Sequence, residues 1–146
     1  METDDMVTRS ASASYEGLGK DGKGKITTQS GVLSDTQYGF NTRFEDGAGT
    51  NPEELIAAAH AGCFTMALAF ALAGAGHSQG NLKTDAKVTL DKDGDGFTIT
   101  KSALTLTGHV EGIDQAEFER IANEAKAGCP VSKVLTCEIT LATTFG

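Results

Sequence analysis

The feature that most constrains the fold is a long stretch without charged side chains, residues 55–76. A helix start precedes it: Asn51 suits an N-cap, Pro52 suits the first helical position, and Glu53 and Glu54 occupy the positive first turn. Asn51 and Glu54 also have the spacing of a capping box. Glycines at 74 and 76 provide a stop signal. The sequence therefore predicts one helix from Asn51 to about residue 73.

This helix is nearly long enough to cross a membrane. Its composition argues against that, because Ala, Gly, His and Thr dominate, basic flanks are missing and two glutamates come directly before it. We expect a long central helix buried inside a water-soluble protein. A buried helix of this length in so small a chain needs cover on several sides, and a partner subunit could supply part of it.

The rest of the chain indicates an α+β fold rather than repeated βαβ units. We expect a first hairpin whose return strand covers 25–30, then an irregular segment over 34–49 that carries Arg43. A second hairpin joins 85–92 to 97–107, and a capping box from Asp114 to Glu117 begins a second helix that ends at Gly128. Its apolar residues follow helical spacing: Phe118, Ile121, Ala122 and Ala125. A short helix after Pro130 and a strand over 136–145 complete a single domain, 1–146, in which 1–8 are expected to form a flexible tail.

Charge and cysteine content narrow the possible functions. The 146-residue chain has a formal net charge of −8 and a pI near 4.7, which disfavours nucleic acid and anionic membrane surfaces as partners. No apolar run follows the acidic N-terminus, so we expect no secretory signal and a cytoplasmic protein. Three cysteines in such a chain do not make a structural disulfide framework.

Metal binding is not favoured by any pattern. The segment 91–96 resembles the start of a calcium loop, but Ser102 stands where the loop needs a bidentate Glu, so we expect a hairpin turn. No histidine has zinc-ligand spacing, and His60 is expected to be a hydrogen-bonded helix residue. We expect no metal or organic cofactor.

The three thiols differ in their local surroundings. Cys129 lies between two helices, just before Pro130, where the N-terminus of a helix lowers a thiol pKa, although a passive thiol is also possible there. Cys63 lies in the middle of the long helix, where burial raises the pKa unless a cation is near; a plain core cysteine is the alternative. Cys137 shares strand parity with core residues and is expected to pack in the core.

Four segments together carry a resemblance that covers nearly the whole chain and is weakest before residue 24. These are Tyr-Gly-Phe-Asn-Thr-Arg-Phe-Glu at 38–45, Gly-Thr-Asn-Pro-Glu-Glu-Leu-Ile at 49–56, Ala-His-Ala-Gly-Cys-Phe-Thr-Met-Ala-Leu at 59–68 and Ala-Lys-Ala-Gly-Cys-Pro-Val-Ser-Lys-Val-Leu at 125–135. Their order and spacing resemble the OsmC/Ohr family, and its OsmC branch more than its Ohr branch. The branch assignment depends on the arginine just before the helix and on the Cys-Pro-Val-Ser motif.

The resemblance implies an OsmC-like fold of antiparallel hairpins packed on two main helices, in an intertwined homodimer. It implies a peroxidase without metal or haem that reduces organic hydroperoxides in oxidative or osmotic stress and is recycled by dithiols such as lipoyl groups. On this pattern Cys63 is the peroxidatic cysteine and Cys129 the resolving one. Arg43 holds the thiolate, and Glu53 orients Arg43.

Helix geometry adds one expectation to these roles. Glu53 and Cys63 are ten positions apart on one helix, so their Cα atoms should lie ~15 Å apart. If Arg43 contacts both, Glu53 and Cys63 should come from different subunits, and the active site should lie at the dimer interface. Two other functions stay open: a redox sensor of the same fold with little turnover, and a non-catalytic dimeric scaffold.

Overall fold

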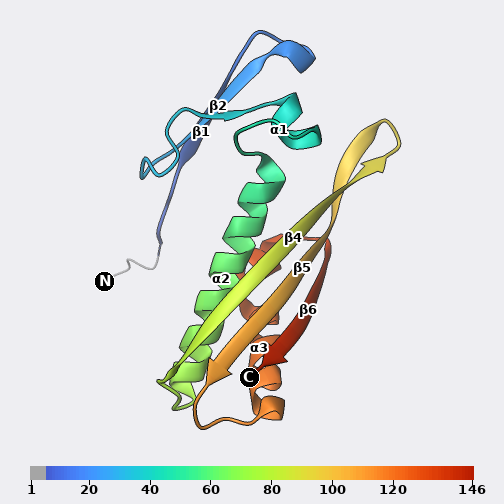
Figure 1. The fold of residues 1–146 in the computed structure, drawn as a ribbon. Coiled ribbons are helices and arrows are strands. Elements are labelled where there is room, and N and C mark those ends of the chain that lie inside the picture. Colours follow the sequence, from blue (N-terminus) through green and yellow to red (C-terminus); the bar gives the residue numbers. More distant parts are fainter. Residues whose placement is uncertain (1–5) are drawn as a thin grey trace. The chain divides into compact units, whose positions relative to one another are not determined.

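A computed structural model describes residues 6–146 of the chain, which divides into two compact units, Met1–Pro52 and Glu53–Gly146 (Figure 1). Of the predicted tail, 1–5 lie outside the described residues, and 6–8 have no regular secondary structure. The expectation of a single domain over 1–146 stays a prediction.

The first unit contains a small antiparallel sheet in the order β1-β2-β3. Strands β1 (Ala11–Glu16) and β2 (Lys23–Thr28) form the predicted hairpin, whose connection includes the short 3₁₀ helix η1 (Gly19–Asp21). The segment expected to be irregular contains strand β3 (Thr36–Tyr38) and the short helix α1 (Phe40–Phe44). Both elements are too short to give a periodic sequence pattern, which explains why they were not predicted.

The second unit contains the long helix and a second sheet. All its predicted helices and strands are present: α2 (Pro52–Gly74), β4 (Gly80–Asp93), β5 (Gly96–Val110), α3 (Gln115–Gly128), α4 (Pro130–Val134) and β6 (Glu138–Phe145). Helix α3 has the predicted cap, because the Asp114 carboxylate accepts a hydrogen bond of 2.8 Å from the Glu117 backbone N–H.

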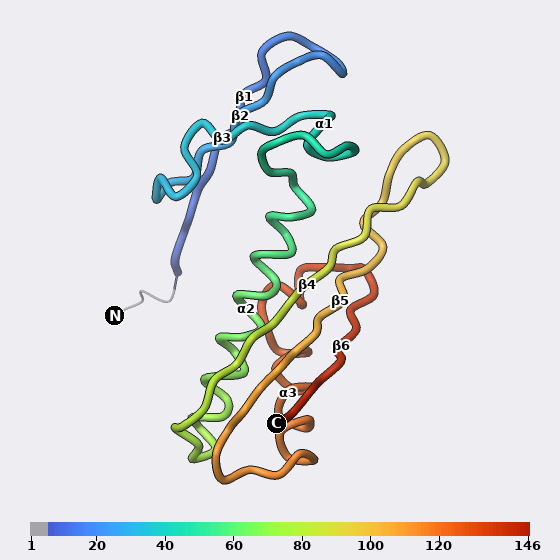
Figure 2. The backbone as a smooth tube through the Cα atoms, in the orientation of Figure 1, coloured from blue at the N-terminus to red at the C-terminus, as the bar shows by residue number. Residues whose placement is uncertain are grey.

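The second sheet has the order β4-β5-β6 and is mixed rather than antiparallel throughout. Strands β4 and β5 pair antiparallel, whereas β6 runs parallel to β5. The expectation of an antiparallel sheet was therefore wrong for β6. The physical reason is the crossover through α3 and α4, which brings the chain back to the end of the sheet where β5 begins (Figures 1 and 2).

The core of the second unit lies between one face of this sheet and the helices α2 and α3. Along β5, buried and exposed residues alternate, so only one face is covered. Gly108 fits there because a Cβ at this position would lie 2.5 Å from the ring of Phe118 on α3. The core side chains are Phe64, Leu68 and Leu72 of α2, Leu104, Leu106 and Val110 of β5, and Phe118, Ile121, Ala122 and Ala125 of α3.

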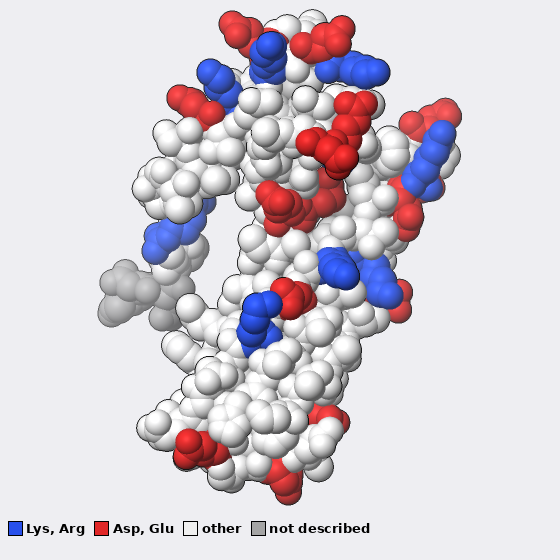
Figure 3. Space-filling view, in the orientation of Figure 1, with Lys and Arg blue, Asp and Glu red and all other residues white. Residues whose placement is uncertain are grey.

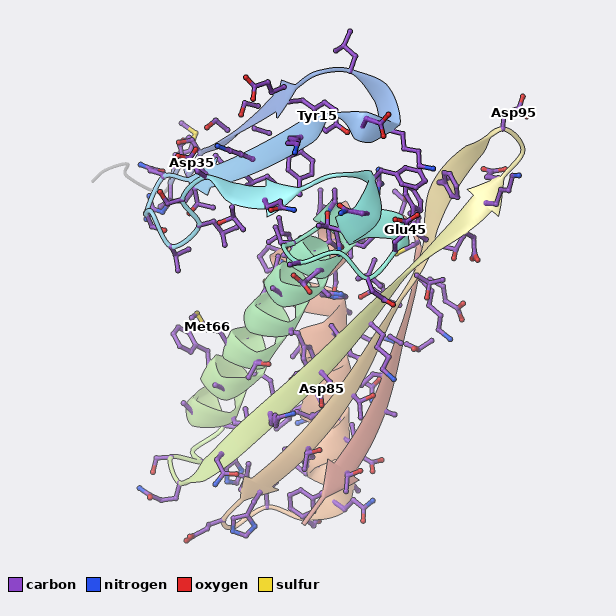
Figure 4. All side chains as sticks on the ribbon, turned by 45° about the horizontal axis from the view of Figure 1, so that its top comes forward. Tyr15, Asp35, Glu45, Met66, Asp85 and Asp95 are labelled. Atoms are coloured by element: carbon purple, nitrogen blue, oxygen red, sulfur yellow. The ribbon has the colours of Figure 1, made fainter. Side chains whose placement is uncertain are left out.

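Within one copy of the chain, helix α2 is buried along one face only, and the expectation that a partner subunit covers part of it stays a prediction. Met66 is 62% exposed and Phe70 73% exposed, and Met66 points away from the sheet (Figure 4). The charge-coloured surface shows mostly uncharged atoms over the C-terminal half of α2 (Figure 3). By length and composition α2 could cross a membrane, and 22% of its most apolar 18-residue window is buried. Within one copy, the core side chains of β5 and α3 cover only one side of this helix.

The acidic segment that resembles a calcium loop is the tip of the β4–β5 hairpin. Strand β4 ends at Asp93 and β5 begins at Gly96, with Asp95 at the tip (Figure 4). The Asp93 carboxylate accepts a hydrogen bond of 2.7 Å from the Thr98 hydroxyl on the facing strand. This confirms the predicted hairpin turn.

Candidate active site

Two of the three cysteines come together inside the second unit. The Sγ atoms of Cys63 on α2 and Cys129 between α3 and α4 lie 3.2 Å apart, although 66 positions separate them in the sequence. Both are free thiols. A disulfide has an S–S distance of ~2.05 Å, so a two-electron oxidation with an approach of about 1 Å between the sulfurs would join them.

Backbone geometry fixes the position of Cys129. Its N–H donates to the Ala125 carbonyl at 2.9 Å and closes α3, while its own carbonyl accepts from Lys133 N–H at 3.1 Å in α4. Pro130 then begins α4, where its missing N–H costs nothing. The Cys129 sulfur accepts a hydrogen bond of 3.5 Å from Ser132 N–H. The predicted junction of two helices is confirmed, and it holds this thiol against α2.

The surroundings of the two thiols shift their pKa values in opposite directions. Burial raises the pKa of Cys63, and the Cys129 sulfur adds to this rise, although a hydrogen bond from Val131 N–H opposes it. Burial also acts to raise the pKa of Cys129, but hydrogen bonds from Ser132 N–H, the Cys63 thiol and the Ser132 hydroxyl outweigh it and lower the pKa. Within the second unit, therefore, Cys129 is the better thiolate. A cation beside Cys63 would be needed to reverse this order.

A buried histidine links the elements around the cysteines. His60 on α2 is fully buried, and its Nδ1 lies 2.6 Å from Ser102 Oγ on β5 while its Nε2 lies 2.8 Å from Ser132 Oγ on α4. Burial lowers the His60 pKa, which favours the neutral ring. The expectation of a hydrogen-bonded helix residue is confirmed. The roles of Ser102 and Ser132 were not predicted, because serines on a strand and in a short helix carry no distinctive pattern.

Arg43 lies on α1 in the first unit, beside an apolar hollow of about 420 Å³. Its guanidinium lies 5.5 Å from the centre of the Phe44 ring, within range of a cation–π contact. Aromatic residues and glycines line most of the hollow, together with one proline and two basic residues. The lining residues are Tyr15, Gly19, Lys20, Tyr38, Gly39, Phe40, Arg43, Phe44 and Pro52.

Glu53 is a buried carboxylate in the first turn of α2. The helix continues without a break from Glu53 to Cys63, so the expected separation of ~15 Å between their Cα atoms holds within one chain. A single side chain reaching both residues would therefore need to bridge about three turns of helix.

Cys137 differs from its prediction. It lies one residue before β6 and is half-buried, and it is not among the side chains that form or contact the core cluster. Ile139, Leu141 and Phe145, with which it was expected to align, do pack against that cluster. The strand starts after Cys137, so the alternation of strand residues does not extend to it.

Comparison with known proteins identifies relatives across most of the chain. The family described as OsmC-like protein matches residues 45–144. The chain is 54% identical to peroxiredoxin OsmC of Escherichia coli over 135 residues, covering 92% of this chain and 94% of the relative. It is 34% identical to the organic hydroperoxide resistance protein OhrB of Bacillus subtilis over 116 residues, or 75% and 79% of the two chains.

Solved structures agree with this assignment. The crystal structure of OhrB from Bacillus subtilis matches with a TM-score of 0.67 at 29% identity and covers 92% of this chain and 98% of its own. The fold and the sequence similarity together show that the chain belongs to the OsmC-like protein family, as the four sequence segments indicated.

Proposed function

We propose that this protein is a cysteine-based peroxidase that reduces organic hydroperoxides to alcohols. The observation that carries the proposal is the 3.2 Å contact between the Cys63 and Cys129 sulfurs. Two thiols at this distance can be oxidised to a disulfide, which a reductant can then convert back to the two thiols. The names of the relatives support the same chemistry, since one is a peroxiredoxin and another an organic hydroperoxide resistance protein.

The reaction has two steps in this proposal. The Cys63 thiolate attacks the outer peroxide oxygen, the O–O bond breaks, and the departing alkoxide takes a proton to become the alcohol. Cys63 is then a sulfenic acid. The Cys129 thiolate attacks its sulfur, the S–O bond breaks, and the hydroxide leaves as water once it is protonated. A Cys63–Cys129 disulfide is the product.

Arg43 and Glu53 complete the site in this proposal. Arg43 supplies the positive charge that Cys63 needs, because burial otherwise keeps that thiol protonated. Glu53 orients Arg43. Since Glu53 and Cys63 lie about three turns apart on the unbroken α2, we infer that one arginine serves a Glu53 and a Cys63 from different subunits.

The dimer required by this arrangement is supported by the exposed side of α2. An apolar helix face that carries Met66 and Phe70 in contact with solvent is typical of a surface that is covered in an assembly. We propose that a second copy of the chain covers it, giving a homodimer with two active sites. Substitution Met66→Lys should shift sedimentation toward the monomer, whereas Asp95→Lys, at the hairpin tip, should not. A wild-type chain that is monomeric at micromolar concentration would contradict this assembly.

The substrate is expected to carry an apolar tail. The hollow beside Arg43 has aromatic walls, which favour an alkyl or lipid hydroperoxide over hydrogen peroxide. We propose a small dithiol or a lipoylated carrier protein as reductant, no metal or organic cofactor, and a cytoplasmic, soluble protein active in stress defence. The acidic net charge of −8 supports partners other than nucleic acid and anionic membranes.

Steady-state turnover tests the function. Cumene hydroperoxide consumption with dihydrolipoamide as reductant should proceed for many cycles, and Cys63→Ser should abolish it, while Cys137→Ser should leave it unchanged. The alternative, a redox-sensing thiol protein of the same fold, would consume one equivalent for each site and stop. After one equivalent of peroxide, non-reducing mass spectrometry should find the Cys63–Cys129 disulfide; oxidation at Cys137 instead would refute the assignment.

A further inference from the structure

His60 has no task in the peroxide chemistry described above, yet it is fully buried and both ring nitrogens are engaged. Burial of a polar ring is costly unless every polar atom has a partner. Its partners Ser102 and Ser132 are themselves buried, and they come from a strand and a helix that are far apart in the sequence. This hydrogen-bonded network of three residues therefore joins α2, which carries Cys63, to β5 and to α4, which follows Cys129.

The hydrogen-bonded network formed by Ser102, His60 and Ser132 reaches the Cys129 sulfur through Ser132. The Ser132 backbone N–H donates to that sulfur at 3.5 Å, and the Ser132 hydroxyl also acts to lower the pKa of Cys129. If the Ser132 hydroxyl directs its proton at the sulfur, it accepts from His60 Nε2–H, and Nδ1 is then the acceptor for the Ser102 hydroxyl. A neutral histidine, one donor and one acceptor, satisfies every link.

The two cysteines differ in their exposure to solvent within one copy of the chain. Cys129 is fully buried, whereas Cys63 is partly exposed. A reductant from solution therefore meets Cys63 first when the two are joined as a disulfide. The rate of thiol exchange also rises as the leaving thiol becomes a more stable thiolate. Access and thiolate stabilisation thus favour the same direction of attack.

We propose that His60 is a positioning residue that acts through Ser132 to hold Cys129 and stabilise it as the departing thiolate, so that a reducing thiol attacks the disulfide at Cys63. The inference depends on the proposed function only in requiring that a Cys63–Cys129 disulfide forms. It deepens that function by assigning the direction in which the enzyme is recycled.

The recycling step balances with a dithiol as the reductant. One thiolate of the dithiol attacks Cys63 Sγ, the Cys63–Cys129 S–S bond breaks, and Cys129 leaves with the electron pair. The second thiolate of the dithiol then attacks the dithiol sulfur that is bonded to Cys63, and the Cys63 thiolate leaves. The dithiol is oxidised by two electrons to a cyclic disulfide, and the two protein thiolates take up the two protons that it has lost.

Trapping the mixed disulfide tests the direction. The Cys137→Ser protein is oxidised with diamide, which needs no peroxidase activity, and is then mixed briefly with 2-mercaptoethanol, quenched in acid and mapped by mass spectrometry. We expect the adduct on Cys63. An adduct on Cys129, or equal amounts on both, would overturn the proposal.

Variants test the part played by the histidine. Ser132→Ala and His60→Leu should each slow reduction of the diamide-formed disulfide by dithiothreitol about tenfold, since each removes the 2.8 Å contact between His60 and the Ser132 side chain that positions the donor to the leaving sulfur. His60→Gln, which can both donate and accept, should recover part of the rate. Thr65→Val is the matched control, because it removes a hydroxyl of α2 that bonds the Ala61 carbonyl and Thr84 instead.

The outcomes separate this inference from the proposed function. Unchanged reduction rates in both Ser132→Ala and His60→Leu, or an equal loss in Thr65→Val, would overturn the role of His60. A disulfide that forms with diamide but not with organic hydroperoxide would refute the peroxidase and leave the inference intact. If diamide forms no Cys63–Cys129 disulfide in the wild-type chain, both are refuted.

Discussion

Replacing Gly108 with alanine should push α3 away from the sheet and pull the two cysteines apart. The added Cβ would lie 2.5 Å from Phe118 Cζ and 3.1 Å from Leu82 Cδ2. Carbon atoms pack best at about 3.5–4.0 Å, so the Phe118 ring must retreat by about 1 Å. Phe118 is fully buried and packs against the tilted ring of Phe145 with ring centroids 4.8 Å apart, which leaves it little room to rotate. We expect α3 to move with its ring.

The expected cost follows from this overlap. Overpacking of a filled core lowers the free energy of unfolding by about 1–3 kcal/mol, which lowers the Tm of a chain of this size by about 3–10 °C. Because α3 ends at Gly128, directly before Cys129, its displacement should also lengthen the 3.2 Å contact between the sulfurs. A misplacement near 1 Å can slow a reaction considerably, and we expect disulfide formation after one equivalent of peroxide to slow about tenfold or more.

Urea unfolding of the reduced protein and the rate of disulfide formation are the two measurements. Gly96→Ala is the matched control, since it adds the same methyl group to the same strand with its nearest contact at 3.8 Å. Replacing the ring by the smaller side chain in Phe118→Leu should relieve the clash. The double variant Gly108→Ala/Phe118→Leu should therefore be at least about 1 kcal/mol more stable than the sum of the two single changes predicts. Additive effects, or an equal loss in Gly96→Ala, would refute this account of α3.

Two further changes test the charge at Cys63 and the cap of α3. Because burial raises the Cys63 pKa, Arg43→Met should slow the first turnover, measured by stopped flow, about 10–100-fold at pH 7. The rate of this variant should then rise about tenfold for each pH unit up to 9. A pH profile like that of the control variant Arg9→Met would contradict the role of Arg43. Asp114→Ala removes the 2.8 Å cap to Glu117 N–H and should cost about 1 kcal/mol in urea unfolding, an effect that Asp114→Asn should largely avoid.

The sequence predicted the elements that have strong local signals. Pro52 and the glutamates after it located the start of α2, and Asp114 located the start of α3. Local signals do not contain contacts between distant segments, so the parallel pairing of β6 and the partners of His60 could not be predicted. A related reason applies to α2: an alanine-rich helix has the same composition whether its own chain or a second copy covers it, so the sequence did not indicate which face stays exposed in one copy.

The pKa values of the two thiols indicate why the proposed site needs a cation from outside the second unit. In the second unit alone, hydrogen bonds lower the pKa of Cys129 and burial raises the pKa of Cys63, the reverse of the order that attack on a peroxide by Cys63 requires. A cation that reaches Cys63 from outside this unit would reverse the order for the first step. Once the disulfide has formed, Cys63 carries no charge for that cation to hold, and the preference of Cys129 for the thiolate form then favours its departure. The hydrogen bonds that lower the Cys129 pKa would thus assist recycling, and a cation beside Cys63 would allow one pair of cysteines to carry out both steps.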